Sequence, residues 1–158
     1  MLKMHVHGIH EVGSAMRARR DLLKDLRRAH LQAAILIQQW VFRNFKAQGT
    51  MHDSPSLRWR PLSASRIRQR TRPRSATNPS GGTWPGQILA VSGSLRMGFV
   101  PNADARSGKV ENYVPYAPYH EHGGKRGRPP QRKMFPDEDQ ARKIVFPIFR
   151  DHVKVSIR

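Results

Sequence analysis

The fold is decided by ILAVSGSLRMGF at residues 88–99 and VENYVPYAPYHEHGGKRGRPPQRKMF at residues 110–135. From Leu95 to Phe99, apolar residues alternate with others, which is the period of a half-buried strand. After a polar connection, residues 110–114 repeat that period. Because the two segments are close in sequence, they predict an antiparallel β-hairpin.

A helical pattern precedes these stretches. Apolar side chains recur at helical spacing through residues 14–46, with Ser14 as a candidate N-cap and Gly49 just beyond the expected end. One helix of that length would be about 50 Å long, whereas a compact globule of this chain length is only about 40 Å across. The long N-terminal helix therefore predicts a kink, a projection or contact with a second copy.

Shorter elements complete the predicted fold. A strand is expected around residues 2–6, a helix capped by Ser63 near residues 64–70, and a helix opening at Asp137. Alternation at residues 153–157 predicts a last strand, after an interruption at Pro147. The fold class is α+β: a single domain over residues 1–158 in which a long helix and shorter helices pack on a small, mostly antiparallel sheet.

Charge dominates the composition. The chain of 158 residues has 29 Lys and Arg, of which 21 are Arg, against 11 acids, for a net charge of +18. The planar guanidinium fork suits phosphates and carboxylates, so this bias favours a polyanion or an acidic protein as partner. Without cysteine there are no disulfides and no Cys-based zinc sites. No apolar run approaches the length of a membrane span, so we expect a soluble protein without a membrane partner.

Basic residues concentrate in one stretch that lacks any acid, residues 58–74. The following Pro, Ser and Gly residues make residues 70–86 a flexible or extended basic loop. A second basic loop lies near residue 126. Candidates for binding DNA or a protein partner are therefore Arg58, Arg60, Arg66, Arg68, Arg70, Arg72, Arg74, Lys125, Arg126 and Arg128.

Catalytic chemistry finds little support. The run His120-Glu121-His122 offers metal-ligand types, but no second ligand pair stands at metal spacing, and the residues that an HNH-type nuclease needs are missing. No phosphate-binding glycine loop, GxSxG or dinucleotide fingerprint occurs. The sequence predicts a protein that is not an enzyme and that has no metal and no cofactor.

Four short motifs nevertheless resemble a known family, the virion-morphogenesis or tail-completion proteins of Mu-like contractile-tailed phages. They span roughly residues 57–136, and residues 88–135 are the signature core. The motifs are Trp59-x-Pro61-Leu62-Ser63, Ile88-Leu89 with Ser92-Gly93-x-Leu95, Tyr116-Ala117 with His120-x-x-Gly123, and Pro129-Pro130-x-Arg132 before Phe135. Candidate structural or interface residues are Trp59, Leu62, Gly93, Leu95, Tyr116, Tyr119, Gly123 and Arg132.

The resemblance implies a structural protein of the head–tail neck. It would form a ring between the head connector or adaptor and the tail tube and sheath, and genomic DNA would pass through it. We expect six copies in the ring, with twelve as the alternative. Six copies would carry about +108, whereas duplex DNA crossing a ring about 40 Å high presents only about 24 phosphates. Much of the charge is therefore expected to meet protein. The alternative is a monomeric protein that binds nucleic acid without sequence specificity.

Overall fold

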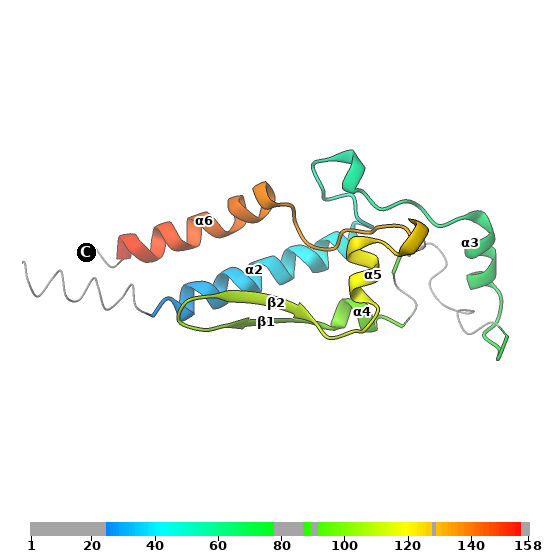
Figure 1. Cartoon of the computed structure of the whole chain (residues 1–158), viewed down its shortest axis with the longest axis horizontal. Helices are drawn as coiled ribbons and strands as arrows, with labels where there is room; N and C mark the ends of the chain where they lie inside the picture. The colour runs from blue at the N-terminus through cyan, green and yellow to red at the C-terminus, as the bar shows by residue number, and fades with distance from the viewer. Residues whose placement is uncertain (1–24, 78–86, 90–91, 128, 156–158) are drawn as a thin grey trace, which may run out of the picture.

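The computed structural model describes residues 25–77, 87–89, 92–127 and 129–155 (Figure 1). The predicted strand at residues 2–6, the predicted cap Ser14 and much of the predicted loop lie outside these residues. The chain has the expected α+β architecture. In chain order the elements are α2 (Arg27–Lys46), η1 (Pro55–Leu57), α3 (Ala64–Thr71), α4 (Ser94–Met97), β1 (Phe99–Ala103), β2 (Gly108–Asn112), α5 (Ala117–His122), η2 (Lys125–Gly127) and α6 (Glu138–Val155).

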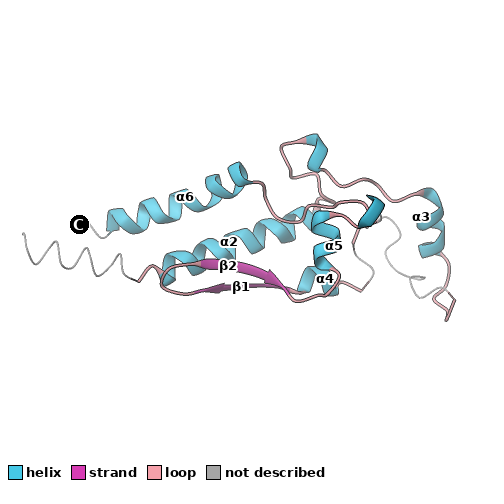
Figure 2. Cartoon of the chain, viewed as in Figure 1, coloured by secondary structure: helices cyan, strands magenta, loops and turns pink. Residues whose placement is uncertain are grey.

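Helix α2 is the centre of the molecule. It contacts both strands of the hairpin on one side and α6 on another, while α3 lies at the far end of the molecule from the hairpin turn (Figures 1 and 2). Strands β1 and β2 pair antiparallel, from Phe99 opposite Asn112 to Ala103 opposite Gly108. The predicted hairpin is confirmed, and the turn is held by Asp104, whose carboxylate accepts hydrogen bonds from the N–H groups of Arg106 and Ser107.

Helix α2 contributes to two separate apolar clusters. The first half of the helix packs through Ala29 and Ala33 on Ile148 of α6. The second half enters a larger core, where Phe45 meets Trp59 edge to face at 5.1 Å between ring centroids. That core also buries Trp40, Val41, Ile88, Leu95, Phe99, Ala117 and Met134. Core contacts with residues 59, 88, 95, 117 and 134 draw the four motif segments to one end of α2.

The C-terminus of α2 is closed by a Schellman motif. The N–H of Gly49 donates to the carbonyl of Asn44 at 2.9 Å, and the N–H of Gln48 donates to that of Phe45 at 3.2 Å. Both Gln48 and Gly49 have positive φ, 56° and 79°. This pair of bonds satisfies carbonyls that a helix end would leave open. The expected helix end before Gly49 is confirmed.

The start of the long helix differs from the prediction. Residues 25 and 26 are not helical, and the N–H of Arg27 instead donates a hydrogen bond to the Asp25 carboxylate oxygen at 2.9 Å. Asp favours such local bonds over a helix interior. A helix of 20 residues is about 30 Å long, so its length no longer argues for a second copy.

Two predicted strands are wrong. Leu95 and Met97 belong to the one-turn helix α4, which follows Gly93 in the left-handed conformation, and β1 begins only at Phe99. Val153 and Val155 lie in α6, which continues through Pro147. In both places an alternating pattern of a few residues was compatible with a helix, and packing against the rest of the chain decided the outcome.

Three smaller expectations agree with the structure. Ser63 caps α3, and its hydroxyl oxygen accepts a hydrogen bond from the N–H of Arg66 at 3.3 Å. Helix α6 begins next to Asp137, whose carboxylate accepts from the N–H of Gln140 at 2.9 Å. None of the described helices is long and apolar enough to cross a membrane.

Candidate partner-binding site

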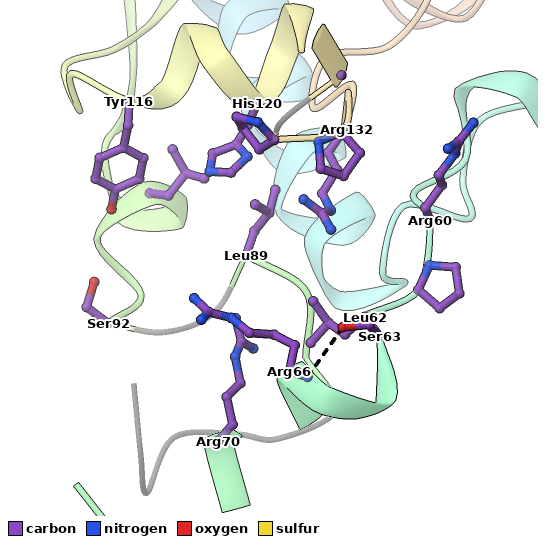
Figure 3. A pocket seen from close by; sticks show the side chains of 15 residues that line it. Arg60, Leu62, Ser63, Arg66, Arg70, Leu89, Ser92, Tyr116, His120 and Arg132 are labelled. Atoms are coloured by element: carbon purple, nitrogen blue, oxygen red, sulfur yellow. Dashed lines mark hydrogen bonds between the residues drawn. The ribbon is translucent and has the colours of Figure 1, made fainter. Parts of the chain in front are cut away.

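A hollow of about 760 Å³ opens between α3, α4, α5 and the segment that follows η2 (Figure 3). Its basic side chains come from several elements: Arg60 precedes α3, Arg66 and Arg70 belong to α3, His120 to α5, and Arg132 to the later segment. The other lining residues are mostly apolar or small: Pro61, Leu62, Ser63, Leu89, Ser92, Leu95, Tyr116, Gly127, Pro129 and Pro130. We call this hollow the arginine pocket.

All four motifs that carry the family resemblance reach the arginine pocket. Leu62 comes from the first motif, Leu95 from the second, Tyr116 from the third and Arg132 from the fourth. The ring of Tyr116 stands perpendicular to that of His120, with 6.0 Å between centroids. Segments far apart in sequence thus build one concave surface.

The charge of the arginine pocket is one-sided. Four arginines and a histidine line it, and no Asp or Glu does so among the described residues. Burial and then the charge of Arg66 lower the pKa of Arg70. Burial and then the charge of Arg70 lower the pKa of Arg132, and burial and then Arg132 lower the pKa of His120. Each lowered pKa means that the surroundings disfavour the charged form of that side chain.

Arg132 is the most unusual member. Its side chain is 8% exposed, and its buried Nε has no hydrogen-bond partner in the described part of the chain. Its backbone is fixed, because the N–H of Arg132 donates to the carbonyl of His120 at 2.7 Å. Arg70 is 4% exposed and donates from a guanidinium nitrogen to the carbonyl of Gln87. The expected partner-binding residue Arg70 therefore lies within the wall of the pocket.

The other predicted site residues are dispersed. Arg58 donates from Nε to the carbonyl of His52 at 3.3 Å, at the edge of the core. Arg68, Arg72, Arg74, Lys125 and Arg126 are exposed, Tyr119 is also exposed, and Arg128 lies outside the described residues. The remaining structural candidates have three roles: Trp59 is buried, Leu62 packs on the core, and Gly93 and Gly123 adopt positive φ beside α4 and α5.

Sequence reasoning missed a polar cluster behind the pocket. The Lys133 carbonyl accepts from Trp59 Nε1 at 2.8 Å, from His52 Nε2 at 2.8 Å and from Asn44 Nδ2 at 3.4 Å. Asn44 and His52 are almost completely buried. The signal in the sequence was Asn44, an amide side chain among the apolar residues of the helix predicted at residues 14–46. The cluster positions the backbone next to Arg132.

Sequence reasoning also set His120 aside after considering it as a metal ligand. The structure instead places it among arginines, and the described residues contain no group of three or more His, Asp or Glu that could hold a metal ion. Its neighbour Glu121 turns away and accepts a hydrogen bond from the N–H of Met134 at 2.6 Å. The two residues thus serve different surfaces.

The chain was compared with family models, with curated proteins and with solved structures, and none of them matches it. The geometry of the arginine pocket and the resemblance of its motifs are therefore the basis for a functional proposal.

Replacing Arg132 by Met is expected to stabilise the free protein by about 1–2 kcal/mol, since a flexible apolar side chain removes a buried cation that has no acidic neighbour in the pocket among the described residues. Urea unfolding followed by circular dichroism measures the change. Arg74→Met is the matched control, because Arg74 is exposed, and it should stay within about 0.5 kcal/mol. A less stable R132M protein would show that the guanidinium supports the fold.

Glu121→Gln is expected to change how stability depends on pH. Burial raises the pKa of the Glu121 carboxyl, although hydrogen bonds from the Met134 and Phe135 backbone oppose the rise. The folded chain then holds a proton that the unfolded chain, with a pKa of about 4.3, has lost. Stability must fall as pH rises through the window between these two pKa values. Urea midpoints measured from acid to neutral pH should show a smaller fall in E121Q.

The control for Glu121 is Glu111→Gln. Hydrogen bonds from Lys109 and Tyr113 lower the pKa of Glu111, against a smaller opposing effect of desolvation. Its stabilising contribution is therefore lost as pH falls, which is the opposite sign. If both variants altered the profile in the same direction, the assignment to Glu121 would be wrong.

Proposed function

We propose that this protein is a structural component of a phage head–tail neck, without a reaction of its own. It assembles as a ring that completes the tail, joins it to the head connector and lets DNA pass. The observation that supports this proposal is the convergence of all four resembling motifs on the arginine pocket. Motifs shared for a docking surface are expected to meet in space, whereas unrelated matches would scatter.

A closed ring requires a heterologous interface, in which two different patches meet. Two candidate patches flank α2. Val100 and Tyr113 are exposed on the hairpin, and Phe146 and Val153 are exposed on α6. The hairpin and α6 lie on different sides of α2 (Figure 1). Exposed apolar side chains on two separate surfaces support self-association.

Light scattering and negative-stain images of the purified protein test the ring. We expect closed particles at moderate salt, lost in Phe146→Glu and kept in Met97→Glu. Met97 is 71% exposed on α4 and lies outside both patches. Met97→Glu therefore adds the same charge as Phe146→Glu at a surface site that is not part of the proposed interface. A protein that remains monomeric at every salt concentration would refute the ring.

The second candidate is a monomer that binds nucleic acid non-specifically. The observation that favours it is the exposure of Arg68, Arg72 and Arg74 in a stretch without acids. Such a protein would bind any duplex, with affinity that falls steeply as salt increases. Finding that behaviour in a monomer would select this candidate over the neck protein.

A further inference from the structure

We propose that the arginine pocket binds an acidic segment of another polypeptide, taking a carboxylate onto Arg132 and an apolar neighbour onto the leucine and proline wall. The inference names the partner chemistry of the docking surface proposed above, and rests on that function only for the place of the partner in the virion.

Arg132 has no acidic neighbour in the pocket among the described residues. Arg132 is 8% exposed, lines the pocket, and leaves its Nε without a partner within the described residues. A buried polar group is nearly always hydrogen-bonded in a folded protein. The carboxylate of Glu121, which follows the pocket residue His120, is committed elsewhere, because it accepts a hydrogen bond from the N–H of Met134 at 2.6 Å. An acceptor from outside the chain completes the site.

The shape and lining of the pocket favour a carboxylate over a nucleic-acid phosphate. Guanidinium groups bind both anions. Phosphates project from the outside of a nucleic-acid strand and are reached by exposed cations, such as Arg68 and Arg74 here. Arg70 and Arg132, in contrast, are both buried, beside Leu62, Leu89 and Leu95.

A polypeptide supplies the required combination. A Glu or Asp next to Leu or Phe presents a carboxylate and an apolar side chain within a few ångströms of each other, whereas a polyphosphate offers only charge. The wall contains four side chains that suit the apolar neighbour: Pro61, Leu62, Leu89 and Pro130. Interfaces of this kind place a desolvated charge pair beside apolar anchors.

A second copy of this chain is a poor donor of that segment. Each copy has only 11 acids against 29 Lys and Arg, so it offers few carboxylates to a neighbour. The one acidic run, residues 137–139, is partly committed: Asp137 caps α6, and Glu138 pairs with Arg142 at 3.1 Å. The partner is accordingly a different, acidic protein.

The test uses the full chain and a short fluorescent peptide that alternates Glu with Leu. Its controls are the same peptide with Gln in place of Glu, and an oligothymidylate of equal charge. Fluorescence anisotropy near physiological salt measures binding. We expect the acidic peptide to bind and the Gln peptide not to bind. Arg132→Met should weaken binding at least about tenfold and Arg74→Met less than about twofold, because a buried charge pair contributes more than an exposed one.

Several outcomes would overturn the inference. Equal losses in R132M and R74M would show diffuse attraction to the basic surface. A tighter complex with oligothymidylate that is lost in R132M would make the pocket a nucleic-acid site. Self-association that is lost in R132M and suppressed by the acidic peptide would make a second copy the occupant. Melting curves of R132M establish that the variant is folded. Peptide binding by a protein that never forms rings would refute the proposed function but leave this inference standing.

Discussion

Trp59→Ala lowers the free energy of unfolding by about 3–5 kcal/mol, the usual effect of deleting a buried indole. Trp59 is 6% exposed, packs on Phe45 and donates from Nε1 to the Lys133 carbonyl. Its loss opens a cavity at the C-terminal end of α2 and leaves a shared acceptor with one donor fewer. Urea unfolding followed by circular dichroism gives the change, since fluorescence would be altered by the substitution itself.

Trp59→Phe separates the contribution of the Trp59 hydrogen bond to stability from the contribution of its packing. Phe keeps most of the apolar contact but cannot donate to Lys133, so the difference between W59F and wild type is mainly the hydrogen bond, about 1 kcal/mol. Met97→Ala is the surface control and should change stability by less than about 0.5 kcal/mol. An unchanged urea midpoint in W59A would show that Trp59 lies at the surface in solution.

Gly49→Ala lowers the free energy of unfolding by about 3–4 kcal/mol, through backbone strain and overpacking together. Gly49 has φ +79°, and a Cβ there would stand 2.1 Å from Cγ of Trp59. Neither the Schellman turn nor the buried indole can move without loss of core contacts. Thermal and urea unfolding measure the destabilisation.

Gly93→Ala is the matched control for Gly49→Ala. Gly93 has the same φ of +79°, but a Cβ there meets nothing within 4 Å among the described residues. It should therefore cost only the backbone strain, about 1–2 kcal/mol. A double-mutant cycle of Gly49→Ala with Trp59→Ala should show that the clash disappears with the indole. Equal effects of G49A and G93A would mean that the ring contact contributes nothing.

Much of the core was predictable from local pattern. The hairpin followed from two alternating segments joined by a polar turn, and Trp59, a structural or interface candidate in the sequence, is buried. The failures came where short patterns were ambiguous. Val153 and Val155 have high strand propensity, yet they belong to a helix whose inner side packs on α2.

The candidate site was predictable only in part. The sequence contains the basic stretch, but it cannot show that Arg70 turns inward while Arg68 stays exposed. The meeting of Arg70 with Arg132 depends on the path of the chain around the end of α2, and no local pattern encodes it. The run His120-Glu121-His122 contains metal-ligand types next to one another in sequence, whereas in space His120 shares a pocket with arginines.

The Lys133 carbonyl has a mechanical consequence. The peptide unit that carries this oxygen begins one residue after Arg132, and three side chains from residues 44–59 donate hydrogen bonds to it. A force applied to Arg132 from outside is transmitted through the next residue, Lys133, to the hydrogen bond that connects its carbonyl with Asn44 of α2. Tension on a partner bound at Arg132 would thus be borne by the molecule's interior and not by its surface loops.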